Sequence, residues 1–179
     1  MKTPALFGFI SALAGAVLTL VLYFAGFHSE AAKMAVAQSI STWVGLLIFT
    51  VCQVLAVRGR RTEVPASQPF GYGSALWAAT QMAFVAAILS SAFSFCYMKF
   101  INPGFADIAL QAQMDKAQAK GISGPTLDRM ESVTRTFLQP GIAATVNLFV
   151  LFIIGVVIGL IVAGFVRRTE ANTPPPIQA

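Results

Sequence analysis

The chain has 179 residues, of which 56% are hydrophobic and 11% are charged, and its mean hydropathy is +0.74. A soluble domain carries about 25% charged residues. The composition therefore excludes an ordinary soluble protein and a disordered chain, and two cysteines are too few for a disulfide scaffold. It indicates an integral membrane protein.

Four long stretches without a charged residue divide the chain, and each is long enough for a spanning helix of about 20 residues. They predict an all-α fold, a bundle of four transmembrane helices over residues 5–27, 36–57, 74–97 and 141–166. The first stretch has the positive start of a signal peptide but exceeds the roughly 7–15 apolar residues of such a segment. We expect residues 1–168 to form a single transmembrane domain, and residues 169–179, with three consecutive prolines, to be a disordered cytoplasmic tail.

The distribution of basic residues predicts how the bundle is oriented. Six of them lie close to helix ends on the side that holds both termini: Lys2, Arg58, Arg60, Arg61, Arg167 and Arg168. The opposite side has only Lys33 in its short loop, and the long segment 99–139 balances basic with acidic residues. Because basic residues in short loops stay in the cytoplasm, both termini are expected there. The net charge of +5 then serves as a membrane anchor, and no basic stripe with interleaved aromatic residues indicates nucleic-acid binding.

Two short patterns occur twice in the chain. Residues 7–13 (FGFISAL) match residues 70–76 (FGYGSAL) at five of seven positions, and Arg-Arg-Thr-Glu follows both the second and the fourth predicted helix. These matches predict two parallel helical-hairpin repeats related by an axis along the membrane normal. The alternative is chance, because the repeated residue types are common in membrane helices.

Small residues recur at four-residue spacing in two predicted helices. The third helix has Ala79, Ala83 and Ala87, and the fourth has Gly155 and Gly159. Association of helices in lipid depends on close backbone approach, which small residues permit. We expect these five residues to pack helices together within the bundle. A homodimer seam, for which the fourth helix is the better candidate, is the alternative.

The outer segment 99–139 is predicted to contain two short amphipathic helices. Asn-Pro-Gly at 102–104 and glycines at 121 and 124 break the chain, which places the first helix over 105–119 and the N-cap of the second at Ser123. The two helices either cap the bundle or lie on lipid headgroups, or they form a recognition surface for a partner. The candidate residues of that surface are Phe105, Ile108, Leu127, Met130 and Phe137.

Groups that could carry out catalysis or bind a metal are scarce. His28 is the only histidine, and we expect it to be a polar residue at the membrane interface rather than a ligand or a base. No His or Cys lies at ligand spacing from acidic residues, so no metal or cofactor site is predicted. Cys52 and Cys96 fall near opposite ends of their helices, so we expect no disulfide between them.

The predicted spans contain uncharged polar side chains but no Asp, Glu, Lys or Arg, which disfavours a proton-coupled pump. Gln53, Gln81 and Asn147 are examples of these polar side chains. We expect them to form interhelical hydrogen bonds, and the alternative is that they line a polar pocket.

Several of these features resemble one bacterial family. They are a Phe-Gly start on the first and third helices, arginine-ended second and fourth helices, and the exit from the third helix, YMKFINPGF over residues 97–105. Over about residues 4–168 the chain resembles the uncharacterised inner-membrane family DUF4199, a domain of unknown function. The resemblance implies a bacterial cytoplasmic-membrane location and carries over no catalytic residue, cofactor or substrate.

The sequence thus favours a non-enzymatic membrane module that binds a protein or lipid partner through its outer helical segment. A small-solute carrier or channel is the alternative. The parallel repeat favours a carrier, whereas the small number of helices and the lack of intramembrane charge disfavour it.

Overall fold

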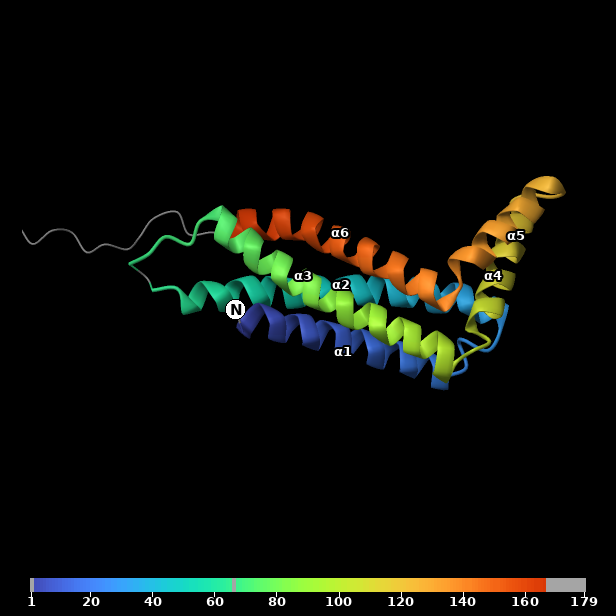
Figure 1. The fold of residues 1–179 in the computed structure, drawn as a ribbon, viewed down its shortest axis with the longest axis horizontal. Helices are drawn as coiled ribbons and strands as arrows, with labels where there is room; N and C mark the ends of the chain where they lie inside the picture. The colour runs from blue at the N-terminus through green and yellow to red at the C-terminus, as the bar shows by residue number, and fades with distance from the viewer. Residues whose placement is uncertain (1, 66, 167–179) are drawn as a thin grey trace, which may run out of the picture.

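The computed structural model describes residues 2–65 and 67–166, which form six α-helices and one π-helical turn (Figure 1). In chain order these elements are α1 (Lys2–Phe24), α2 (Ala31–Glu63), α3 (Tyr72–Cys96), the π-helical turn η1 (Tyr97–Ile101), α4 (Phe105–Ala119), α5 (Pro125–Phe137) and α6 (Pro140–Val166). The helices α1, α2 and α6, together with α3 continued by η1, are long and apolar enough to cross a membrane. The chain is therefore a multi-pass membrane protein. The predicted disordered tail, 169–179, lies outside the described residues.

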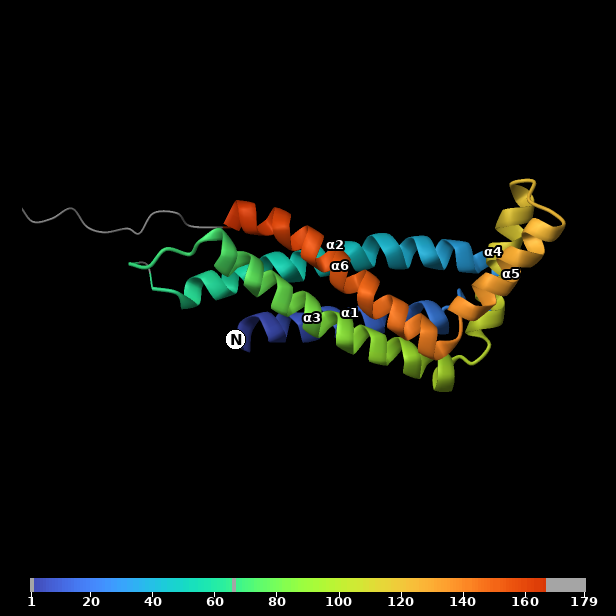
Figure 2. The ribbon, with the colours of Figure 1, turned by 45° about the horizontal axis from the view of Figure 1, so that its top comes forward.

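The four spanning helices form an elongated bundle, and α4 and α5 form a hairpin that projects from one end of it (Figure 1, Figure 2). That end is named here the hairpin end. The opposite end holds the start of α1 and the end of α6, and we name it the arginine end after Arg58, Arg60 and Arg61 of α2. Within the bundle α3 lies between α1 and α6, and α2 packs on α1 and also contacts α3 and α6.

Three spanning segments differ clearly from their predicted bounds, and one of them is α3 with η1, which covers Tyr72–Ile101 rather than 74–97. α1 ends at Phe24 rather than at residue 27, because Gly26 adopts a φ of 79°. The amide of Gly26 donates to the carbonyl of Tyr23 and that of Phe27 to the carbonyl of Leu22, which is the Schellman arrangement of a helix end. α2 is longer at both ends than the predicted 36–57 because its flanking charged residues lie outside the apolar span without interrupting the helix.

The two predicted outer helices are present. α4 has the predicted bounds, and its end repeats the Schellman arrangement around Gly121, whose φ is 82°. The N-cap of α5 is Gly124 rather than the predicted Ser123, with Pro125 as the first helical residue. Arg135 of α5 reaches Asp107 of α4 with 3.7 Å between nitrogen and oxygen, which links the two helices of the hairpin.

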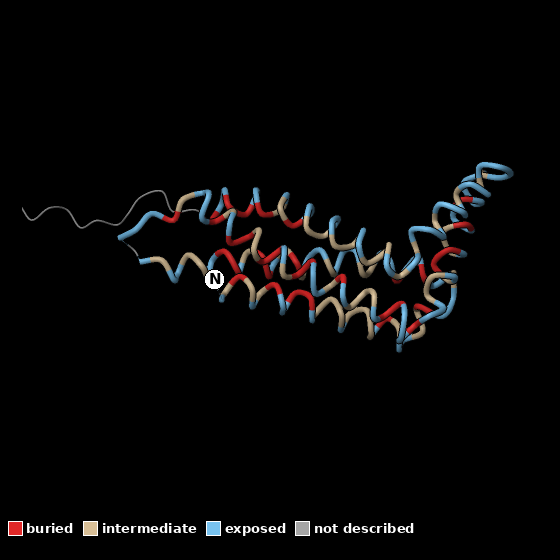
Figure 3. Tube along the Cα trace, in the orientation of Figure 1, coloured by how far each residue is buried: buried red, intermediate tan, exposed pale blue. Residues whose placement is uncertain are grey.

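Buried residues concentrate in the half of the bundle that is nearer the arginine end (Figure 3). We call this the arginine half and the other the hairpin half. The predicted packing residues Ala79, Ala83 and Ala87 of α3 are all at most 1% exposed. A Cβ at Gly155 would lie 2.5 Å from the Cβ of Ala83, and one at Gly159 would lie 3.0 Å from the Cβ of Ala79. The glycine stripe of α6 is therefore covered by α3 of the same chain, so it is not free to form the alternative homodimer seam.

Polar side chains inside the bundle form hydrogen bonds between helices. Gln53 of α2 is fully buried, and its Nε2 donates to the carbonyls of Gly155 at 2.7 Å and Ala79 at 3.3 Å. Asn147 of α6 donates to the hydroxyl of Ser91 on α3 at 3.4 Å. Cys52, which is buried, and Cys96, which is exposed, are both free cysteines.

The sequence matches between residues 7–13 and 70–76 do not correspond to equivalent surroundings. Gly8 lies inside α1, where a Cβ would be 2.7 Å from the carbonyl oxygen of Met82 on α3. Gly71 is the N-cap of α3, and no atom lies within 4 Å of its Cβ position. The internal repeat stays a prediction.

Candidate functional site

The hairpin half of the bundle contains an open-sided cavity of about 720 Å³. All four spanning helices contribute to its wall, from Ser11 on α1 and Gln38 on α2 to Ser94 on α3 and Asn147 on α6. None of the residues that line it carries a formal charge. The cavity thus offers an uncharged, mostly apolar space with several hydroxyl and amide groups in its wall.

Small residues and the course of two helices create this space. Gly15 of α1 and Gly45 of α2 both line the cavity, and no atom lies within 4 Å of either Cβ position. Figure 2 shows α2 and α6 separating toward the hairpin end. The exposed side chains Leu46 of α2 and Ile154 of α6 line the cavity as well, so its open side lies between these two helices and would face lipid.

An aromatic ring closes the cavity on the side of the arginine half. Phe49 of α2 lines the cavity and is 4% exposed. Its ring contacts α6 at Gly155, which leaves room for it because glycine has no side chain. Gln53 lies one turn further along α2 and joins α2 to α6 by the hydrogen bond already described. Its Oε1 is buried and has no hydrogen-bond partner in the described part of the chain.

A buried cluster of rings forms the wall at the hairpin end of the cavity. His28, in the connection between α1 and α2, is 5% exposed, and its Nδ1 lies 2.5 Å from the hydroxyl of Tyr97 in η1. The Nδ2 of Asn102 donates to the same hydroxyl at 3.2 Å. Phe105, the first residue of α4, packs edge-on against both His28 and Tyr97. His28, Tyr97 and Phe105 all line the cavity.

Burial lowers the pKa of His28 from its ordinary value of 6.5. Desolvation is the physical cause, since it disfavours the charged imidazolium. The ring is therefore neutral at pH 7, when it has one nitrogen that donates a hydrogen bond and one that accepts.

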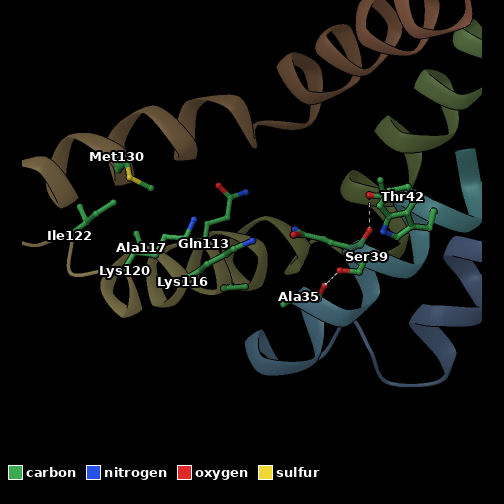
Figure 4. A pocket seen from close by; sticks show the side chains of 12 residues that line it. Ala35, Ser39, Thr42, Gln113, Lys116, Ala117, Lys120, Ile122 and Met130 are labelled. Carbon is green, nitrogen blue, oxygen red and sulfur yellow. Dashed lines mark hydrogen bonds between the residues drawn. The ribbon is translucent and has the colours of Figure 1, made fainter. Parts of the chain in front are cut away.

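A second hollow of about 500 Å³ lies between α2 and the hairpin (Figure 4). We name it the lysine groove, because Lys116 of α4 and Lys120, the C-cap of α4, are the charged residues in its wall. Neither ammonium group forms an ion pair within the described residues 2–65 and 67–166. Gln38 and Thr42 of α2 line both the groove and the cavity, so the two hollows adjoin at these side chains.

Comparison with known proteins identifies the family but no relative of known function. Residues 6–168 match the family described as "Protein of unknown function (DUF4199)". The chain belongs to this family. No curated protein and no solved structure matches the chain. The resemblance drawn from the helix ends and from the exit of the third helix is thus confirmed.

The five residues predicted as an outer recognition surface do not gather into one patch of this DUF4199 protein. Phe105 faces the cavity, and Met130 lines the lysine groove. Ile108 and Leu127 are half-buried, and Phe137 is 53% exposed. Of these five residues, two therefore line the candidate site, and Phe137 is left to solvent or lipid.

Sequence reasoning missed the residues that give the site its chemistry. The sequence predicts His28 as a polar residue at the membrane interface, but it does not predict that Tyr97 and Phe105 enclose the imidazole ring. The four-residue spacing of Lys116 and Lys120 does predict a shared helix face, and this signal could have been used. No group of three His, Cys, Asp or Glu side chains able to hold a metal ion occurs in the part of the chain that the structure describes.

Proposed function

We propose that this protein is a non-enzymatic membrane module that binds an anionic lipid at its hairpin end. The headgroup occupies the lysine groove and the apolar part occupies the cavity. We further propose that the hairpin end faces away from the cytoplasm, because the basic residues of the arginine end belong on the cytoplasmic side.

The observation that carries this proposal is the junction of the two hollows at Gln38 and Thr42. An uncharged, largely apolar cavity there adjoins a groove with two lysines that have no acidic partner among the described residues. Lysine ammonium groups bind phosphate as point charges. Two neighbouring lysines without ion-pair partners therefore favour a negatively charged ligand. A lipid matches both hollows, because its anionic headgroup suits the lysine groove and the acyl chain attached to it suits the adjoining apolar cavity.

The level of the groove in the bundle also supports a lipid. Trp43 of α2 lines the lysine groove and is 72% exposed. Tryptophan is enriched where a membrane meets water, because its ring is apolar and its indole N–H is polar. A groove at this level would lie among lipid headgroups, while the cavity beneath it would lie among acyl chains.

Lipid selectivity of the purified full-length protein in a mild detergent tests the proposal. Phosphatidylglycerol should raise the melting temperature more than phosphatidylcholine does. The Lys116→Gln/Lys120→Gln variant should lose this difference, because the groove then carries no charge. The Lys33→Gln/Lys99→Gln variant removes two charges outside the groove and should keep the difference between the two lipids. Equal responses of the two variants, or no preference in the wild type, would overturn the proposal.

A small-solute carrier or channel is the second candidate, favoured by one observation. Gln53 lies one helical turn beyond Phe49 toward the arginine end, and its Oε1 has no hydrogen-bond partner among the described residues. A polar group is thus present on the far side of the ring that closes the cavity. Flux of small solutes into proteoliposomes tests this candidate. Transport that increases in the Phe49→Ala variant would favour it over lipid binding.

A further inference from the structure

The hydrogen bonds around Tyr97 determine which nitrogen of His28 carries the proton. The Tyr97 hydroxyl accepts a hydrogen bond from Asn102 and has a single proton to donate. It lies 2.5 Å from Nδ1 of His28, and no other acceptor for its proton is found among the described residues. The hydroxyl therefore donates to Nδ1. Neutral His28 then carries its own proton on Nε2.

The Nε2–H group of His28 has no hydrogen-bond partner within residues 2–65 and 67–166. The side chain is nineteen-twentieths buried, and it lines the uncharged cavity. Tyr97 and Phe105 hold the imidazole edge-on from two sides, with ring centroids at 5.8 and 5.4 Å. The cavity wall thus contains one oriented, unused donor on a neutral ring.

We propose that His28 donates a hydrogen bond from Nε2 to an ester carbonyl oxygen of the bound lipid, and that Tyr97 and Asn102 are positioning residues for this donor. The inference rests on the proposed function and names the ligand more closely, as an anionic diacyl lipid with ester-linked chains. A neutral donor in an uncharged wall suits a neutral acceptor, whereas the phosphate is bound by the lysines. In a glycerophospholipid the ester carbonyls lie between the phosphate and the acyl chains, as the order of groove and cavity requires.

A pair of probes that differ only in the carbonyl tests this inference. Dioctanoyl phosphatidylglycerol and its dioctyl diether analogue carry the same headgroup and nearly the same chains, and the diether lacks both carbonyls. Binding of each probe to the purified full chain is measured in detergent. A single neutral hydrogen bond corresponds to about a two- to tenfold difference in affinity, so the wild type should prefer the ester by this factor.

Four variants separate a role of His28 from an effect on folding. His28→Phe should bind both probes equally, because it has no donor. His28→Gln should keep the ester preference, because the side-chain amide can place an N–H near the position of Nε2. Tyr97→Phe should reduce the preference by releasing the imidazole. Tyr72→Phe removes a hydroxyl that donates to the Leu160 carbonyl at the arginine end, and it should leave the preference unchanged.

The possible outcomes distinguish this inference from the proposed function. An ester preference that persists in His28→Phe overturns the inference, and the proposed function still stands if the Lys116→Gln/Lys120→Gln variant binds both probes weakly. If that double variant binds both probes like the wild type, the proposed function fails. Competition by glycerol 3-phosphate or inorganic phosphate at the affinity of the lipid overturns the inference, because the ligand is then a soluble anion. If His28→Phe does not fold, the other two variants decide. The inference then stands only if His28→Gln keeps the ester preference and Tyr97→Phe reduces it.

Discussion

The ring of Phe49 on α2 lies where a side chain at Gly155 on α6 would have to be. A Cβ at Gly155 would lie 2.9 Å from Cζ of Phe49 and 2.5 Å from Cβ of Ala83 on α3. Three helices thus meet at one glycine. This contact separates the packed arginine half of the bundle from the open hairpin half.

Substitution Gly155→Ala should therefore destabilise the protein. The new methyl group contacts a ring and a second methyl group that are both buried, and overpacking of this kind costs about 1–3 kcal/mol. Thermal unfolding in detergent measures the effect. The matched control is Gly164→Ala on the same helix, where no atom lies within 4 Å of the Cβ position. Equal melting temperatures of the two variants would contradict the packing described here.

Leucine at Gly15 or Gly45 should fill the cavity without disturbing the fold. Both Cβ positions are free of neighbours within 4 Å, and both residues line the cavity. Gly15→Leu and Gly45→Leu should therefore keep the melting temperature of the wild type within a few degrees and lose binding of phosphatidylglycerol. Gly164→Leu adds the same side chain outside the cavity and should bind normally. Normal binding by both cavity variants would show that the lipid binds elsewhere.

A charge at the position of Gln53 should be poorly tolerated. The residue is fully buried, and its Nε2 donates to two backbone carbonyls. Gln53→Glu replaces this donor with a carboxylate that faces the same carbonyls, so it should destabilise the protein by several kcal/mol near pH 8. Gln53→Met keeps the volume and removes the unpartnered Oε1, so a change of about 1 kcal/mol or less is expected. Unfolding measurements in which Gln53→Met is the worse variant would refute this account.

The stability of the protein should decrease as the pH falls below about 6.5. Because burial lowers the pKa of His28 in the folded state, the unfolded chain takes up a proton at higher pH than the folded one. The contribution of His28 is complete above pH 6.5 and is lost as the pH falls from 6.5 toward the lower folded pKa. Melting temperatures at pH 7.5 and 5.5 should therefore differ more in the wild type than in His28→Gln. Parallel pH profiles would exclude this linkage.

The orientation can be tested with single cysteines. In a background without Cys52 and Cys96, Ser123→Cys places a thiol at the tip of the hairpin, and Ser67→Cys places one in the connection between α2 and α3. Both serines are exposed. A membrane-impermeant maleimide should label Ser123→Cys in intact spheroplasts, and Ser67→Cys only after permeabilisation. The reverse pattern would place the lysine groove in the cytoplasm.

Charge spacing in the sequence predicted the four spanning helices but not their ends. A charged group is expensive in lipid, so charge-free stretches mark where the chain crosses the membrane. They do not mark where a helix stops, and α2 therefore continues past Arg58 to Glu63. Conversely, Gly26 ends α1 inside an apolar stretch, because a left-handed glycine depends on local backbone hydrogen bonds that hydropathy does not measure.

The candidate site was less predictable because its residues are distant in the sequence. His28 and Tyr97 are 69 residues apart, and only the packing of η1 onto the connection between α1 and α2 joins them. The two lysines were visible in the sequence, but the acidic residues of the same segment balance their charge. In the fold Arg135 pairs with Asp107 and Glu131, whereas Lys116 and Lys120 form no ion pair within the described residues.

The length of α2 gives the protein a mechanical connection between its two ends. With 33 residues the helix is about 50 Å long, compared with about 30 Å for the hydrocarbon layer, and it contains no proline. Thr42 lines the lysine groove, whereas Arg61 at the far end donates to the carbonyl of Val166, the last described residue of α6. If a ligand in the lysine groove tilts α2, the hydrogen bond from Arg61 to the Val166 carbonyl of α6 shifts with it. Ligand binding in the groove on one side of the bilayer would thus change a contact on the other side, because the uninterrupted helix α2 joins the two.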